Sequence, residues 1–230
     1  IMSDSRTKNT VRNIGAGLIN QVVSIILPFI NRTIILWSLG VEFTGLSGLF
    51  SSILSVLGIA ELGFNTAIVY SLYRPMSEHD ENKICEIVSL FQKIYGIIGT
   101  IVLVLGMAIM PFLKYLIHGS YPSEINLYAV YFLYLLNSVI SYYMFAYKEC
   151  LLIADQRQDM AQNMRTIVNI LRYVAQFVVL LKFRSFYYYL IVAIIGTVVT
   201  NLGIQCITVR KYPYFKQIKK KQHIPKELIT

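Results

Sequence analysis

Two charged side chains, Arg172 and Glu61, stand inside long apolar stretches of this sequence. An arginine at the centre of a bilayer costs roughly 2.5–3.5 kcal/mol on insertion scales, and Arg172 falls near the middle of its stretch. Such a group turns toward a partner or toward water and away from lipid tails. Two interpretations follow. Arg172 and Glu61 form a structural ion pair between helices, or a basic, water-filled interior attracts an anionic substrate.

Amide and hydroxyl side chains recur in these stretches at helical spacing. Relative to Asn13, the residues Asn20, Ser24 and Asn31 are offset by 7, 11 and 18 positions, which places them within about 20° of one direction on a helix. Three later stretches carry comparable stripes: Asn137, Ser141 and Lys148; Gln162, Arg165, Asn169, Arg172 and Gln176; and Thr197, Asn201, Gln205 and Thr208. Stripes on at least three helices favour a shared polar interior over one buried ion pair. We predict a cavity lined by the following residues: Arg32, Arg172, Asn20, Asn31, Asn169, Gln176 and Asn201.

The elements that position these side chains are long apolar segments. Hydrophobic residues make up 56% of the 230 residues, charged residues make up 14%, and the mean hydropathy is +0.57. A soluble domain carries about 25% charged residues, so this composition indicates a membrane protein. A helix needs roughly 20 apolar residues to cross a bilayer, and its backbone groups must bond within the segment. We predict an all-α membrane protein, a six-transmembrane-helix bundle with spans at Val11–Leu39, Thr44–Leu72, Ile84–Leu113, Ile125–Ile153, Ala161–Leu181 and Phe186–Val209.

Basic residues distinguish the two sides of the predicted bundle. Lys and Arg gather near both ends of the chain and in the connections after the second and fourth spans, whereas the other side carries Lys114, Lys182 and Arg184. The more basic side is cytoplasmic by the positive-inside rule, so we predict that both ends of the chain are cytoplasmic. The net charge of +9 therefore reports topology, and we expect membrane lipids and no nucleic acid as partners. The predicted domains are a transmembrane bundle at 1–209 and a basic cytoplasmic linker or tail at 210–230.

Motifs of several enzyme classes are missing from the sequence. It contains no Walker loop, no His/Cys cluster with metal-ligand spacing and no nucleophile–base pattern. The three cysteines, Cys85, Cys150 and Cys206, share no metal-ligand spacing and fit a packing role. The connections on the side opposite the termini are short, which leaves little room for catalytic residues there. We therefore expect a protein that is not an enzyme and that uses neither a cofactor nor a metal.

Several segments resemble a known family. Residues 39–50 read LGVEFTGLSGLF and residues 60–67 read AELGFNTA, and the pattern continues with YSLYRP at 70–75 and ADQR at 154–157. Over nearly its whole length, the chain resembles bacterial polysaccharide flippases. These are the O-antigen and capsule repeat-unit exporters of the multidrug/oligosaccharidyl-lipid/polysaccharide exporter superfamily.

This resemblance implies two six-helix bundles around a central cavity in the bacterial inner (cytoplasmic) membrane. The implied cargo is an undecaprenyl-pyrophosphate-linked oligosaccharide, flipped from the cytoplasmic to the outer leaflet for surface polysaccharide biosynthesis. Arg32 and Arg172 would be the charge partners of the pyrophosphate. Proton or sodium coupling is also implied, with Glu61 as the candidate titrating group. Because such transporters have twelve or more helices, we expect this chain to be the N-terminal half of one, or a half-size protein that dimerises.

Two other functions remain open at this point. A membrane enzyme of polysaccharide assembly, such as a polymerase or a polyprenyl-phosphate glycosyltransferase, should carry a long outer loop with carboxylates or arginines, and this sequence lacks one. A drug/ion antiporter of the same superfamily should line its cavity with carboxylates that hold cationic drugs, whereas the cavity predicted here is basic. Both alternatives therefore fit the residues less well than flipping does.

The coupling role of Glu61 can be tested by removing its titration. In the full-length protein, Glu61→Gln keeps the size of the side chain but removes its ionisable proton. We expect the pH or sodium dependence of polysaccharide export to change, as measured by surface polysaccharide over a range of pH and sodium concentration. An unaltered dependence would leave Glu61 with a structural role only.

Overall fold

Helices account for most of the described chain. The computed structural model describes residues 6–58, 62–117, 121–122, 124–144 and 148–214. Their helices are α1 (Arg6–Leu39), α2 (Val41–Leu57), α3 (Leu62–Ser77), α4 (Glu81–Ile109), α5 (Leu113–Leu116), α6 (Leu127–Tyr143), α7 (Glu149–Ala154), α8 (Gln158–Phe183) and α9 (Phe186–Lys211), with a short 3-10 turn at Met110–Phe112. Every regular element within these ranges is helical, in agreement with the predicted all-α class.

The predicted spans are found in two forms. The first, third, fifth and sixth correspond to long apolar segments within α1, α4 to α5, α8 and α9, each long and apolar enough to cross a membrane. The chain is therefore a multi-pass membrane protein. The second span contains α2 and α3 and the fourth contains α6 and α7, and residues 59–61 and 145–147 between them lie outside the described ranges. The helix α2 ends at Leu57, before Gly58, a residue with a weak helical preference. The helix α6 ends at Tyr143, before Met144, whose φ of −94° and ψ of 71° are not helical.

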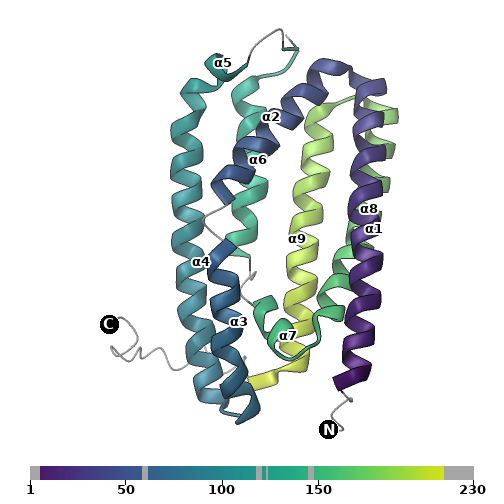
Figure 1. Ribbon diagram of the computed structural model, residues 1–230. Helices are drawn as coiled ribbons and strands as arrows, with labels where there is room; N and C mark the ends of the chain where they lie inside the picture. Colours follow the sequence, from purple (N-terminus) through teal and green to yellow (C-terminus); the bar gives the residue numbers. More distant parts are fainter. Residues whose placement is uncertain (1–5, 59–61, 118–120, 123, 145–147, 215–230) are drawn as a thin grey trace.

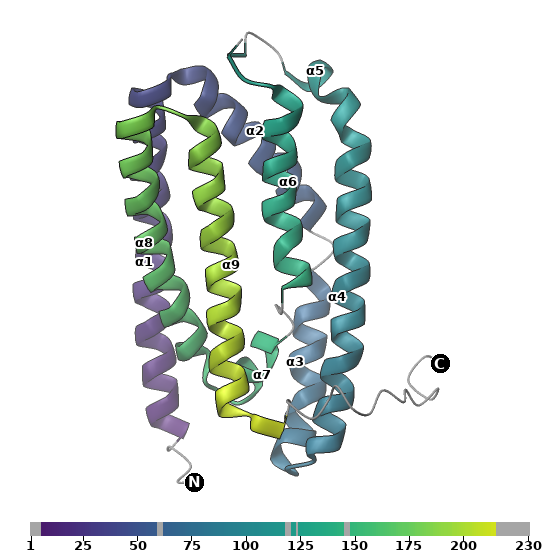
Figure 2. The same ribbon diagram turned by 180° about the vertical axis from the view of Figure 1, so that it is seen from behind.

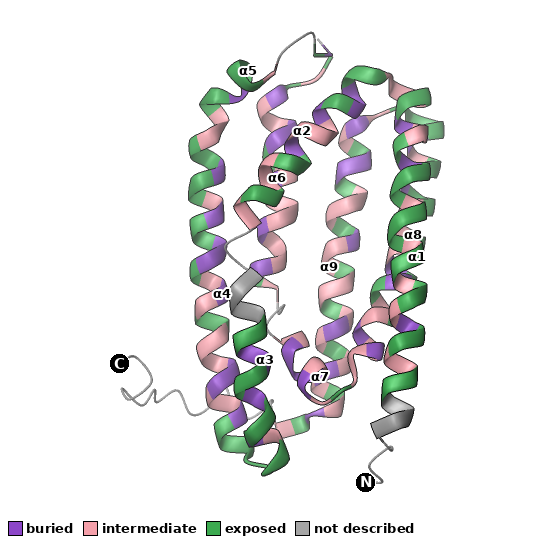
Figure 3. Cartoon of the chain, viewed as in Figure 1, coloured by how far each residue is buried: buried purple, intermediate pink, exposed green. Residues whose placement is uncertain are grey.

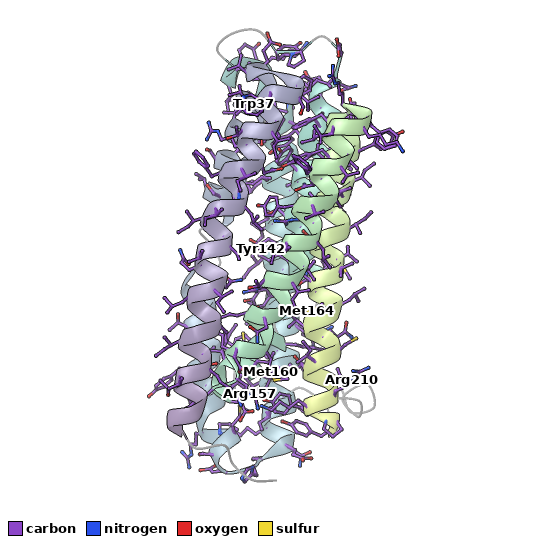
Figure 4. All side chains as sticks on the ribbon, turned by 90° about the vertical axis from the view of Figure 1, so that its right-hand side faces the viewer. Trp37, Tyr142, Arg157, Met160, Met164 and Arg210 are labelled. Carbon is purple, nitrogen blue, oxygen red and sulfur yellow. The ribbon has the colours of Figure 1, made fainter. Side chains whose placement is uncertain are left out.

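The long helices run roughly side by side (Figures 1 and 2). The helix α9 packs against α8 on one side and against α6 on the other, while α1 packs against α8 and α4 packs against α6. The start of α1 and the end of α9 lie at the same end of the bundle, here called the lower end, and the end of α1 and the start of α9 lie at the opposite, upper end. Figure 4 shows Trp37 near the upper end and Arg157 near the lower end.

Local signals in the sequence set several helix ends. Gly40 joins α1 to α2 with a φ of 107°, a left-handed conformation that glycine adopts without steric cost. The Asp80 carboxylate accepts a hydrogen bond from the Lys83 backbone N at 3.0 Å and caps the start of α4. Asn126 caps α6 in the same way through the backbone N atoms of Tyr128 and Ala129. Polar residues therefore stand where the helices begin, and the apolar runs follow them.

The core lies on the inward faces of the helices (Figure 3). The buried Phe50 ring of α2 packs edge-on against Tyr131 and Tyr134 of α6, with ring centroids 5.3 and 5.6 Å apart. The outward face of α1 is apolar and exposed, and it includes Val11, Ile14, Leu18, Val22, Phe29 and Trp37. Exposed apolar side chains along a spanning helix fit contact with lipid tails, which are themselves apolar.

Gly99 provides a test of the close packing of α4 on α6. A Cβ atom at Gly99 would lie 2.8 Å from Tyr142 Cβ and 3.3 Å from Tyr143 Cε2. Because Tyr142 Cβ is attached to the backbone, Gly99→Ala would force the helices apart, and overpacking of this kind costs roughly 1–3 kcal/mol. We expect a lower midpoint of thermal unfolding in detergent. Gly96→Ala is the matched control, since a Cβ there meets nothing within 4 Å, and equal midpoints for the two variants would contradict the packing described here.

Candidate functional site

The polar stripe of α1 faces α8 and the turn that precedes it. Asn20 Nδ2 donates to Thr166 Oγ1 of α8 at 3.0 Å. Near the lower end, Asn13 Nδ2 donates to the Gln156 carbonyl at 2.9 Å, and Asn13 Oδ1 accepts from the Asp159 backbone N at 2.8 Å. Amides in hydrocarbon have no water to bond, so such interhelical partners fix the rotation of α1 about its axis.

A buried polar cluster, formed by Asn31, Gln176 and Tyr189, continues this seam toward the upper end. Asn31 Nδ2 donates to the Tyr189 hydroxyl at 2.7 Å, and Gln176 Nε2 donates to the Tyr189 carbonyl at 3.2 Å. All three residues are buried, and Gln176 is only 2% exposed. The Gln176 Oε1 atom has no hydrogen-bond partner within the described ranges. Tyr189 of α9 therefore bonds both α1 and α8. The Gln176 Oε1 atom remains a buried acceptor beside it.

Arg172 lies next to this cluster, in the interior of α8. Its aliphatic stem packs on Gly196 of α9, and its guanidinium carbon lies 4.8 Å from the centroid of the Tyr173 ring. The Arg172 Nε atom is buried and has no acceptor in the part of the chain that the structure describes. A buried charged donor without an acceptor costs more than a neutral one, which alone costs about 1–3 kcal/mol.

The other predicted cavity residues lie in varied surroundings. Asn169 is half-buried on α8, and Asn201 is half-buried on α9 with its Nδ2 bonded to the Thr197 carbonyl of the same helix at 2.9 Å. Arg32 is exposed, although its neighbour Asn31 is buried. The structure therefore gathers Asn31, Gln176 and Arg172 around Tyr189 and places Arg32 on an exposed face of α1. Glu61 lies outside the described residues.

The reasoning from sequence missed Tyr189, because the aromatic residues at the start of the sixth span fit a membrane-interface belt equally well. A signal for it exists in the spacing. Tyr189, Gly196 and Gly203 follow one another at intervals of seven, which returns a helix to nearly the same direction. This face packs on α8, where Arg172 meets Gly196 and Met164 meets Gly203. Gly196 and Gly203 therefore lie on the same face of α9 as Tyr189, and this face packs closely on α8 and carries one polar side chain.

At the lower end, three carboxylates tie the helices together. Asp159 lies 3.4 Å from Arg12 Nε and 3.2 Å from Arg157 Nε, and Arg165 pairs with Glu149. These pairs link α1, α7 and α8. They also show that Arg12, Arg157 and Arg165, on the side predicted to be cytoplasmic, have acidic partners.

The third carboxylate, Asp155, reaches the end of α9. It pairs with Lys211 and accepts a hydrogen bond from the Tyr212 hydroxyl at 2.6 Å. Burial, followed by this hydrogen bond, raises the pKa of Tyr212, and burial raises the pKa of Tyr214 to about 12. Both phenols therefore remain neutral at physiological pH and act here as hydrogen-bonding and packing groups.

A comparison with known families identifies the family of this chain. Residues 10–230 match the family model described as polysaccharide biosynthesis protein. The chain belongs to the polysaccharide biosynthesis protein family. Neither a curated protein nor a solved structure matches it. The resemblance that we drew from the segments at 39–50, 60–67 and 154–157 is therefore confirmed at the level of the family.

One of these segments has a clear place in this polysaccharide biosynthesis protein. Residues 154–157 form the turn between α7 and α8, where Gln156 adopts a φ of 57°. The turn is held from α1 by Asn13 and from the end of α9 by Lys211 and Tyr212. This segment of the resemblance therefore lies where separate helices are joined.

The hydrogen bond between Asn31 and Tyr189 can be measured by a double-mutant cycle. Interhelical hydrogen bonds in a membrane protein contribute on average about 0.6 kcal/mol and at most about 1.7 kcal/mol. We expect Asn31→Ala and Tyr189→Phe to show a coupling in this range in the free energy of unfolding in mixed micelles. Asn20→Ala with Tyr189→Phe is the control pair, because Asn20 bonds Thr166 instead, and these two changes should be additive. Coupling of equal size in both pairs would refute a specific bond.

Proposed function

We propose that this protein translocates lipid-linked oligosaccharides across the bacterial inner membrane for surface polysaccharide biosynthesis. The cargo is an undecaprenyl-pyrophosphate-linked repeat unit, flipped from the cytoplasmic to the outer leaflet. The observation that carries the proposal is the unpaired Arg172 Nε, a buried cationic donor within a spanning helix. Membership in the polysaccharide biosynthesis protein family supplies the biological context.

The charge of Arg172 suits a pyrophosphate cargo. A guanidinium binds phosphate oxygens through two parallel, charge-assisted hydrogen bonds, which are shorter and stronger than neutral ones. Arg172 as a whole is half-buried, but its Nε is fully buried without an acceptor within the described ranges, so an anionic ligand would relieve the cost of burying that donor. The neighbouring Gln176 adds an unpaired amide oxygen that can accept from a sugar hydroxyl. Asn20, Asn31, Asn169 and Asn201 are proposed as further polar contacts, with Arg32 as a second cation.

The helices of the second and fourth spans also favour transport. Secondary transporters commonly build their substrate sites from discontinuous spanning helices. Here α2 is followed by α3 and α6 by α7, and α3 packs against α7 in the lower half of the bundle. We propose that each of these pairs crosses the membrane once, which gives six crossings with both ends of the chain on the cytoplasmic side. The transporter would be completed by a second six-helix half or by dimerisation, with proton or sodium coupling through Glu61.

The orientation follows from the two ends of the bundle. Figure 4 shows Arg157 and Arg210 near the lower end, whereas Lys182 belongs to the last turn of α8, which ends at the upper end. Because cytoplasmic loops carry the excess of basic residues, the lower end is the cytoplasmic side in this proposal. The basic residues from Arg210 onward would then lie near anionic lipid headgroups.

Arg172→Ala, made in the full-length protein, tests the proposed function. Loss of one charge-assisted hydrogen bond of about 1.5–3 kcal/mol corresponds to at least about a tenfold loss of affinity. We expect surface polysaccharide to fall at least about tenfold, while membrane insertion is unchanged. The measurements are surface polysaccharide on cells and the amount of protein in the membrane fraction.

Arg184→Asn is the control, because Arg184 is an exposed arginine beyond the end of α8. Asn also tolerates the left-handed conformation of this residue, whose φ is 46°. Normal surface polysaccharide in Arg172→Ala cells would remove Arg172 from the mechanism. If export persists while polymer length changes, an assembly enzyme becomes the better interpretation.

A further inference from the structure

Two glycines of α9, Gly196 and Gly203, leave gaps that side chains of α8 fill, and these gaps are here called notches. At Gly203, an added Cβ would lie 2.0 Å from Met164 Cε, 2.9 Å from Sδ and 3.1 Å from Cγ. The closest of these atoms is the far end of a flexible side chain. Figure 4 shows Met164 on α8 beside α9. At Gly196, seven residues earlier, the neighbouring side chain is Arg172, and the contact reaches back to its Cβ.

The notch at Gly196 holds the stem of the arginine. An added Cβ would lie 2.5 Å from Arg172 Cδ, 2.9 Å from Cγ and 3.3 Å from Cβ. Contacts below 3.0 Å essentially never occur for real Cβ atoms. The contact extends from Cδ back to Cβ, so rotation of the guanidinium alone cannot relieve it. Any side chain at this position would displace Arg172 along most of its length, or push α9 away from α8.

This notch determines where the charge of Arg172 lies. With the stem against the backbone of α9, the guanidinium lies over the Tyr173 ring, and its Nε remains buried without an acceptor within the described part of the chain. A long arginine side chain loses up to about 2 kcal/mol of rotamer entropy when it is ordered. A stem already ordered by packing avoids that loss when a ligand binds.

We infer that Gly196 is a positioning residue for transport: its missing side chain seats the stem of Arg172 against α9 and aims the guanidinium at the pyrophosphate of the cargo. This inference rests on the proposed function, because it takes Arg172 as the group that binds the anion. It adds a residue on a different helix whose own atoms need not touch the cargo.

The first test compares two alanine substitutions on the same face of α9 in the full-length protein. Gly196→Ala should lower surface polysaccharide about tenfold, as Arg172→Ala does, because it displaces the guanidinium. Gly203→Ala should retain most of the export, because the end of the Met164 side chain can move aside. The double variant Gly196→Ala with Arg172→Ala should export no less than Arg172→Ala alone. Normal export in Gly196→Ala, or a further loss in the double variant, would overturn the inference.

A binding measurement separates positioning from loose packing. In full-length protein in nanodiscs, Gly196→Ala should raise the half-saturation concentration for undecaprenyl pyrophosphate about tenfold. Binding of the uncharged undecaprenol should remain unchanged, because only the phosphate contacts the guanidinium. Equal weakening of both lipids would show that Gly196 acts through general packing and would overturn the positioning role.

The two proposals fail in different ways. Normal export and pyrophosphate binding in Arg172→Ala would reject the proposed use of Arg172, whatever Gly196 does. Impaired Arg172→Ala with unimpaired Gly196→Ala would reject the positioning role alone. Thermal unfolding gives a further check: Gly196→Ala should lower the midpoint in the presence of Arg172 and lower it less in the Arg172→Ala background, and equal losses in both would show that the two residues are not coupled.

Discussion

The bundle depends on one constraint: a polar group inside hydrocarbon must find its partner within the protein, either on its own helix or on a neighbouring one. Asn20 of α1 bonds Thr166 of α8, and Asn31 of α1 bonds Tyr189 of α9. Each bond is weak alone, but together they fix which face of α1 turns inward. The opposite face of α1 is then free to be apolar. The polar seam thus determines both the packing of α1 and the surface that it presents to lipid.

Arg172 departs from this pattern as a charged group, as Gln176 Oε1 does as a neutral one. The amide nitrogens of Asn20 and Asn31 have partners within the bundle, whereas Arg172 Nε has none in the described ranges. The aliphatic part of Arg172 is well packed on Gly196, so the missing partner does not result from a loose side chain. An ordered stem with an unpaired charged donor is a combination that packing alone does not require. For this reason the functional interpretation centres on Arg172 and not on the amides.

Helical periodicity predicted the faces of the helices but not their partners. Offsets of 7, 11 and 18 placed the α1 stripe on one side, and the structure turns Asn13, Asn20 and Asn31 of that side toward α8, α9 and the turn before α8. No spacing rule could tell that Thr166 and Tyr189 would be the partners, because this depends on how three separate helices meet. The ends of α2 and α6 inside the second and fourth spans were missed for a related reason. Apolar content gives the length of a membrane segment, but it does not report a local departure from helical φ and ψ such as that of Met144.

The two ends of the bundle are held by different kinds of interaction. At the upper end, Phe186 stacks on Tyr189 with an interplanar angle of 6° and packs edge-on against Phe43 at 5.2 Å. At the lower end, Asp159 in the first turn of α8 holds Arg12, and Asp155 in the turn before α8 holds Lys211. Asp159 is buried and its partner Arg12 is about one-third exposed, so parting this pair costs more than the roughly 0–1 kcal/mol of an exposed pair. Separating packed aromatic rings exposes apolar area and also loses about 0.5–1.5 kcal/mol per pair beyond it. The two ends therefore differ in chemistry: the upper end is held by apolar packing, whereas the lower end, where the proposed cargo would enter, is held by ion pairs whose strength depends on their hydration and on salt.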